Sequence, residues 1–141
     1  SDGGFQTGSM MGSGGFIVYN DTACIVRNTW NFARFYAHES CGQCSPCREG
    51  TGWMEKVLHR IETGYGTEED IELLWSIQSQ IEGNTICPLG DAAAWPVAAA
   101  IRHFREEFEY HVRFPEKIKN RDHFVNEPMS KVRHLLQGQM V

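Results

Sequence analysis

The feature that most constrains this chain is a set of four cysteines that come from two separate segments. Cys41, Cys44 and Cys47 are spaced C-x-x-C-x-x-C, and Cys87 follows far downstream, directly before Pro88. Three cysteines from one loop and a distant fourth before proline are typical of the ligands of a 4Fe-4S cluster. Four thiolates form a closed shell, which holds and transfers electrons but leaves no open position for a substrate. We therefore predict one 4Fe-4S cluster with these four cysteines as its ligands.

Two other uses of the cysteines remain open from the residues alone. A structural zinc module would also use four thiolates, although zinc ribbons usually present two C-x-x-C pairs. A disulfide framework is disfavoured because the chain has five cysteines, an odd number, and no recognisable signal peptide. The fifth cysteine, Cys24, lies in an apolar, helix-like segment. We predict that it is a small buried side chain without a role at the cluster.

The residues around the three-cysteine loop suit a negatively charged cluster. Gly42 lets the backbone come close and point amide N–H groups at the sulfurs. Ser45 and Pro46 are typical of an N-cap and a first helical residue, so Cys47 is expected in the first turn of a helix whose positive dipole end faces the cluster. Arg48 adds a full positive charge nearby.

Composition limits the class of protein. The chain has 141 residues, of which 41% are hydrophobic and 22% charged, as in an ordinary globular domain with a modest core. The formal net charge of -5 disfavours a nucleic-acid partner, because phosphate contacts need a basic face. No apolar run approaches the roughly 18 residues that indicate a membrane-spanning helix.

Helical spacing of apolar side chains predicts two helices on either side of the three-cysteine loop. The first is expected over about 22–38, with an N-cap at Asn20 or Asp21. The second is expected over about 46–63, where Gly64 is suited to end it.

Two further helices are predicted downstream. Thr67 and Asp70 form a capping box for a helix over about 68–82, which Gly83 stops. Pro96 is expected to open the long last helix, so that Cys87 lies in the loop between the third and fourth helices.

Aromatic and histidine side chains receive no role in the redox centre. At helical spacing the aromatic residues are expected to pack in the core: Trp30, Phe32, Phe35, Tyr36, Trp75, Trp95, Phe104 and Phe108. The histidines are expected at the surface or beside the cluster rather than as ligands, because four suitable thiols are already present: His38, His59, His103 and His111.

The predicted fold class is mainly α. Four helices with short loops predict an antiparallel bundle that carries the cluster at the end where both cysteine loops meet. Residues 1–20 are expected to form a glycine-rich connector from a preceding domain, ending in a strand at 16–19. Residues 21–114 form the four-helix iron-sulfur domain. Residues 115–141 form a polar C-terminal tail, either half-ordered or docked on a partner through an amphipathic piece at 129–136.

Several segments of the sequence resemble a known protein family. The stretch E-S-C-G-Q-C-S-P-C-R-E-G, from Glu39 to Gly50, resembles the iron-sulfur signature of the flavoprotein, NADH-binding subunit of respiratory complex I, NADH:quinone oxidoreductase. The segments I-E-G at 81–83, C-P-L-G-D-A-A-A-W-P at 87–96 and R-H-F at 102–104 are similar to the same subunit's C-terminal part. The resemblance runs from about Met10 to Phe114. Related subunits occur in NAD-reducing hydrogenases and formate dehydrogenases.

The resemblance implies a function in electron transfer. In this family the parent enzyme passes hydride from NADH to FMN, and the cluster takes electrons singly from the reduced flavin towards quinone in the respiratory chain. The sites for FMN and NADH are expected mainly upstream, so the chain alone is not expected to be catalytic. Leu89 and Gly90, directly after the fourth cysteine, are where an approach of the flavin is expected.

The resemblance also implies partners and a location. Expected partners are other iron-sulfur subunits, especially a thioredoxin-like 2Fe-2S subunit, with no nucleic acid and no direct membrane span. The expected location is cytoplasmic in bacteria, or on the matrix side in mitochondria, peripheral to the inner membrane.

Overall fold

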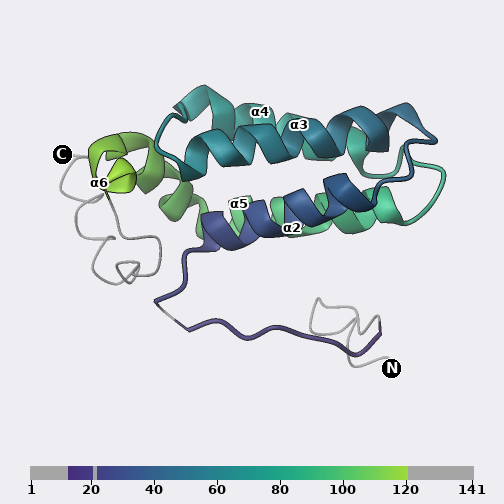
Figure 1. Cartoon of the computed structure of the whole chain (residues 1–141), viewed down its shortest axis with the longest axis horizontal. Coiled ribbons are helices and arrows are strands. Elements are labelled where there is room, and N and C mark those ends of the chain that lie inside the picture. Colours follow the sequence, from purple (N-terminus) through teal and green to yellow (C-terminus); the bar gives the residue numbers. More distant parts are fainter. Residues whose placement is uncertain (1–12, 21, 121–141) are drawn as a thin grey trace.

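The computed structural model describes residues 13–20 and 22–120, and the described part is mainly helical. Four long helices run antiparallel as a bundle, and a short fifth helix follows them (Figure 1). Their bounds are α2 (Ile25–Glu39), α3 (Ser45–Glu62), α4 (Glu68–Ile81), α5 (Leu89–Arg113) and α6 (Pro115–Lys119). The predicted fold class, a mainly α four-helix bundle, is confirmed.

The core lies between the four long helices. Helix α3 contacts the other three long helices. Helices α2 and α4 each also pack against α5. The centre is mostly aliphatic, and its fully buried members come from every long helix: Val26, Met54, Leu58, Ile61, Ile71, Leu74, Ile81, Val97 and Phe108. Apolar residues three or four apart place one stripe of each helix inward, which is the pattern that predicted the helices.

The predicted capping box at the start of α4 is confirmed. Thr67 is the N-cap, and its hydroxyl accepts a hydrogen bond from the backbone N–H of Asp70 while the Asp70 carboxylate accepts one from the backbone N–H of Thr67. At the other ends, Gly64 after α3 and Gly83 after α4 adopt φ of +87° and +75°. This left-handed conformation is the one that glycine supplies at helix C-termini.

The predicted start of the first helix is wrong by about three residues. Helix α2 begins at Ile25. Cys24 is at the N-cap position, but its side chain makes no capping hydrogen bond to the backbone. Asn20 instead closes a turn ahead of the helix, because its side-chain oxygen accepts hydrogen bonds from both the backbone N–H and the hydroxyl of Thr22. An Asn side chain that satisfies a local turn no longer needs to cap a helix.

The predicted start of the last helix is also wrong. Helix α5 begins at Leu89 rather than Pro96, with Pro88 as its N-cap residue in a helical conformation. Pro96 lies inside the helix, and the backbone departs from helical angles further on, at Phe104. Proline is well suited to a helix start, and the sequence offers two candidates. The structure uses the one that directly follows Cys87.

The strand expected at residues 16–19 is not formed. The backbone there belongs to no strand, and Phe16 and Val18 are more than four-fifths exposed. A strand needs a neighbour to pair with, and no other strand occurs in the described part of the chain. Of the glycine-rich segment, residues 1–12 lie outside the described residues.

The segment predicted to be a polar C-terminal tail begins with a helix, α6. Helix α6 packs its buried Ile118 over Gly64, where an added methyl group would meet the backbone oxygen of Pro115. The folded part therefore extends to about residue 120. The amphipathic piece at 129–136 lies outside the described residues.

The expectation that the aromatic residues pack in the core is only partly right. Phe108 is fully buried, whereas four of the named rings are at least about a third exposed: Phe35, Trp75, Trp95 and Phe104. Trp75 and Trp95 lie at bundle surfaces, where their indole rings contact Arg102 and Glu82 respectively. None of the described helices is long and apolar enough to cross a membrane.

Candidate metal centre

The two loops that carry the four spaced cysteines meet at one end of the bundle (Figure 1). The α2–α3 loop and the α4–α5 loop border one cavity of about 250 Å³. Its lining includes all four cysteines that the sequence pattern predicts as ligands: Cys41, Cys44, Cys47 and Cys87. Glu39, Gln43, Ile86 and Leu89 complete it. None of the five cysteines is paired in a disulfide in this structure.

The α2–α3 loop is braced by Arg48 and Ser40. Gly42 has φ of +77°, and the carbonyl oxygen of this residue accepts a hydrogen bond from Arg48 Nη1 at 3.2 Å. Arg48 Nη2 also donates to Ser45 Oγ at 3.3 Å. The predicted positive charge is therefore beside the loop, and it also holds the loop's shape.

The expected amide contact at Gly42 takes a different form. The backbone N–H of Gly42 donates to Ser40 Oγ at 3.4 Å rather than to a sulfur. Ser40 Oγ in turn lies 3.1 Å from Cys47 Sγ. The serine hydroxyl thus stands between the glycine amide and the thiol. Hydrogen bonds to cluster sulfurs are one of the factors that set a cluster's potential.

Cys47 is in the first turn of α3, as predicted, but the N-cap is Cys44 rather than Ser45. Ser45 and Pro46 are the first two helical residues. Cys47 is buried, Cys44 is half-buried, and Cys41 and Cys87 are exposed. The positive end of the α3 dipole therefore points towards the cavity, where thiolates are stabilised.

The α4–α5 loop presents Cys87 through a set of short-range contacts. The Gly83 backbone N–H donates to Asp91 Oδ1 at 2.8 Å, which ties the loop start to α5. Thr85 Oγ1 donates to the carbonyl oxygen of Cys87 at 2.9 Å. Gly90 is buried against this threonine, and an added methyl group would lie 2.2 Å from Thr85 Cγ2. Leu89 is half-buried beside Cys87 and lines the cavity.

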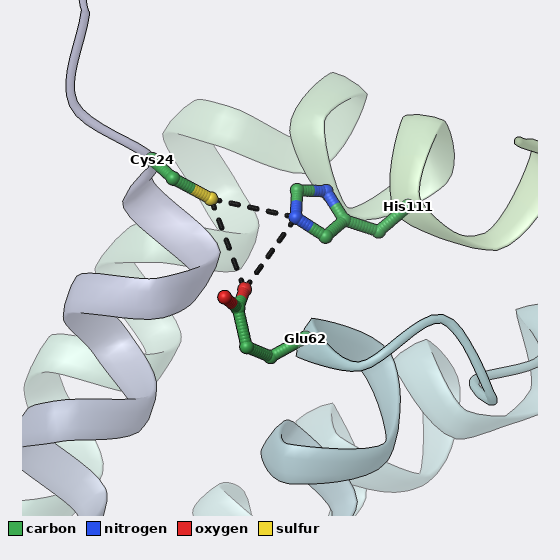
Figure 2. Close-up of side chains that lie close together, drawn as sticks. All are labelled: Cys24, Glu62 and His111. Carbon is green, nitrogen blue, oxygen red and sulfur yellow. Dashed lines mark hydrogen bonds and ion pairs between the residues drawn. The ribbon is translucent and has the colours of Figure 1, made fainter. Parts of the chain in front are cut away.

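The opposite end of the bundle holds buried polar residues to which the sequence pattern assigns no site. Cys24 is buried as predicted, but it contacts His111 and Glu62 instead of apolar groups alone (Figure 2). His111, expected at the surface or beside the cluster, is only 4% exposed. The one sequence signal is that His111 lies three residues after the inward Phe108, on the same side of a helix.

Two of these polar residues have shifted pKa values. Burial disfavours the charged form of His111, but hydrogen bonds with Cys24 and Glu62 outweigh it and raise the pKa of the imidazole to about 9. Burial raises the pKa of the Glu107 carboxyl to about 7, against the nearby charge of His111 and a hydrogen bond from the backbone of Ile25. Both groups therefore favour their protonated forms in the fold.

Comparisons with known proteins give one consistent match. Residues 27–111 match the family model described as the NADH-ubiquinone oxidoreductase-F iron-sulfur binding region. The chain is 48% identical over 108 residues to an F-type subunit of the NADH-quinone oxidoreductase of Rhizobium meliloti, covering 77% of the chain and 25% of that protein. It is 50% identical over 113 residues to the F-type subunit of the NADH-quinone oxidoreductase of Rickettsia typhi, covering 80% of the chain and 25% of that protein.

A solved structure agrees with the sequence comparisons. The chain resembles an NAD⁺-reducing [NiFe]-hydrogenase in its H₂-reduced state with a TM-score of 0.61 and 39% identity. The match covers 64% of this chain and 16% of the hydrogenase chain. The chain thus spans about a quarter of the length of the curated relatives named above.

Proposed function

Because this chain belongs to the NADH-ubiquinone oxidoreductase-F iron-sulfur binding region family, whose cofactor is a 4Fe-4S cluster, we propose that Cys41, Cys44, Cys47 and Cys87 are its ligands. The observation that carries the proposal is that two loops far apart in sequence bring these four thiols to one cavity. Soft thiolates are the ligands that iron-sulfur clusters use.

The residues around the cavity suit a cluster that carries negative charge. When bound, the cluster supplies a centre that accepts and releases single electrons. The α3 N-terminus and Arg48 place positive potential beside it, while Ser40 offers a hydroxyl to Cys47. These groups stabilise thiolates and added electrons, so they favour the reduced state of whatever centre the cysteines hold.

In the parent enzyme, we propose that this module accepts electrons one at a time from reduced FMN and passes them on. FMN and NADH would be bound mainly by sequence upstream of the module. Leu89 lines the cavity next to Cys87, and Gly90 packs against Thr85 of the same loop, so the Leu89–Gly90 segment is the proposed point of approach to the flavin. The proposed acceptors are other iron-sulfur subunits, above all a thioredoxin-like 2Fe-2S subunit.

A second candidate parent is a diaphorase subunit of an NAD-reducing hydrogenase or formate dehydrogenase. The structural match to an NAD⁺-reducing hydrogenase favours it. The higher identity to the quinone oxidoreductase subunits, 48% and 50% against 39%, favours the respiratory enzyme. We therefore propose that the module belongs to an NADH:quinone oxidoreductase, on the cytoplasmic or matrix side and peripheral to the inner membrane.

The ligand assignment is tested by replacing cysteines at the two ends of the bundle. Cys87→Ala removes one of four proposed ligands, so the reconstituted chain should lose most of its iron and its visible absorption. Cys24→Ala is the matched control, because this cysteine is at the other end and should leave iron content unchanged. Iron and sulfide are measured per chain after anaerobic reconstitution. Full iron content in Cys87→Ala would refute the assignment.

A further inference from the structure

The end of the bundle opposite the cysteine loops holds a buried trio of metal-binding side chains. Cys24 comes from the start of α2, Glu62 from the last residue of α3, and His111 from near the end of α5. Figure 2 shows the three side chains pointing at one another from these helices. Each residue is at most 6% exposed. Glu62 is fifteen positions after Cys47 in α3, so the trio lies about 22 Å from the loops that carry the other four cysteines.

We propose that Cys24, Glu62 and His111 bind one zinc ion that joins α2, α3 and α5 at this end. Their ligand atoms all lie within 4.8 Å of one another, and no other group of three or more such residues does so within the described part of the chain. The proposal does not depend on the redox function proposed for the other end.

The spacing of the ligand atoms fits a tetrahedral zinc ion. Cys24 Sγ lies 3.4 Å from His111 Nε2 and 3.9 Å from Glu62 Oε2, and these last two atoms are 3.5 Å apart. Zinc bonds of about 2.3 Å to sulfur and 2.0–2.1 Å to nitrogen and oxygen, at tetrahedral angles, give separations of about 3.6, 3.5 and 3.3 Å. Each observed separation is within a few tenths of an ångström of its expected value, so a single ion fits without a large movement.

The histidine is already oriented for a metal. His111 Nδ1 lies 2.7 Å from the carbonyl oxygen of Glu107, and a carbonyl can only accept, so Nδ1 carries the hydrogen. In the neutral ring, the lone pair is then on Nε2, which faces Cys24 and Glu62. Zinc-binding histidines commonly have this arrangement, in which the second ring nitrogen donates to a carbonyl or carboxylate.

Charge balance favours a divalent ion in this buried place. When the ion displaces the proton of His111, a thiolate, a carboxylate and a neutral imidazole carry a charge of -2, which one Zn²⁺ neutralises. An unbalanced charge would be costly to keep away from water. Glu107, whose carboxyl interacts electrostatically with His111, has a buried side-chain oxygen, Oε2, with no hydrogen-bond partner among the described residues, but it does not belong to the trio. The mixture of sulfur, nitrogen and oxygen ligands is one that zinc accepts and that Mg²⁺ and Ca²⁺ do not.

The test measures zinc on the full 141-residue chain with its cluster reconstituted, so that the other four cysteines are occupied. The chain is stripped with a chelator, given one equivalent of zinc in the presence of a weak competitor, desalted and analysed for zinc and iron. We expect about one zinc per chain. Zinc-edge X-ray absorption should show one sulfur at about 2.3 Å and nitrogen or oxygen neighbours at about 2.0–2.2 Å.

Variants separate this site from the cluster site. Cys24→Ala and Glu62→Gln should lose the zinc but keep their iron. The loss of an outer-shell partner alone weakens metal binding roughly 10- to 100-fold, and the loss of a ligand should cost at least as much. His103→Ala, an exposed histidine on the same helix as His111, should keep both metals. Glu62→Gln preserves the side-chain size, and its iron content and circular dichroism report whether the bundle remains folded.

Three results would overturn the proposal. No zinc uptake by the unsubstituted chain would mean that the trio is a hydrogen-bonded group that holds a proton and binds no metal. Zinc with only sulfur neighbours would place the ion in the cluster loops. Equal zinc in the parent chain and in a folded Glu62→Gln variant would show that the ion binds elsewhere.

Discussion

At the residue scale, Arg48 is the side chain with the clearest effect on the proposed redox centre. Its guanidinium donates hydrogen bonds to Gly42 and Ser45 in the loop that carries three of the cysteines. A positive charge beside a negatively charged cluster stabilises the reduced form more than the oxidised form. Arg48 acts on the proposed cluster both through its charge and through the loop that it holds. The effect of replacing Arg48 on the reduction potential is therefore compared with that of removing a positive charge far from the cluster.

Arg48→Gln should lower the reduction potential of the cluster. Loss of one charge beside the cluster, at an assumed separation of about 10 Å, changes the potential by roughly tens of millivolts when the effective dielectric constant is about 20. Arg113→Gln, at the far end of α5, is the matched control and should leave the potential unchanged within about 10 mV, because solvent screens charge over such a distance. Redox titration followed by EPR measures both, and a rise in the Arg48 variant would contradict the assigned position of the charge.

Gly90 is the residue that allows the Cys87 loop to pack against α5. A methyl group added there would lie 2.2 Å from Thr85 Cγ2 and 2.5 Å from Thr85 Oγ1, so the loop must shift. Gly90→Ala should therefore lower the free energy of unfolding by about 1–3 kcal/mol and speed the loss of iron.

The control for Gly90 is a glycine with open space around it. An added methyl group at Gly52 meets no atom within 4 Å, and this residue is inside α3. Gly52→Ala should raise the free energy of unfolding by about 0.5–1 kcal/mol, because alanine loses less conformational freedom in a helix. Urea unfolding measures both variants. Equal stabilities would show that the contact between Gly90 and Thr85 is not tight.

At the element scale, α4 depends on its first turn. Thr67 and Asp70 satisfy each other's backbone N–H groups, and Asp70 also pairs with Arg60 of α3. Thr67→Ala should lower the free energy of unfolding by about 1 kcal/mol, as is usual for the loss of an N-cap. Ser79→Ala, on the exposed side of the same helix, should cost nothing because alanine is the better helix former. An unchanged urea midpoint in Thr67→Ala would show that the capping box contributes little.

The helices could be predicted well from the sequence, but two of their starts could not. Periodicity locates Val26, Leu58 and Leu74 on inward stripes because each helix needs only its own residues for that pattern. A start depends on which of several suitable residues the tertiary structure uses. Asn20 is used in a turn, and α5 begins at Leu89, directly after Pro88, rather than at Pro96.

At the scale of the whole molecule, the residues at one end of the bundle could be grouped into a site from the sequence, whereas those at the other end could not. Three of the cysteines proposed as cluster ligands are close together in one motif, and the helix pattern then returns Cys87 to the same end. The trio at the other end is assembled from distant positions: Cys24 is 38 residues from Glu62 and 87 residues from His111. No local spacing connects these residues, so only the packing of three helices brings them together.

The two loops of the bundle bring the four proposed ligands of the candidate redox centre to one cavity. The four thiols proposed as ligands would fill the coordination shell, so they would leave no open position for a substrate at the cluster. The chain spans about a quarter of its curated relatives, and the proposed exchange of electrons with flavin belongs to the longer protein. What this chain must do by itself is hold the cluster.

Counting iron and acid-labile sulfide after anaerobic reconstitution of the 141-residue chain tests that claim most directly. The proposed ligand set predicts about four iron and four sulfide per chain. It also predicts that dithionite reduction bleaches the visible absorption. A chain that binds one zinc at these four cysteines, with no sulfide and no visible absorption, would contradict the account.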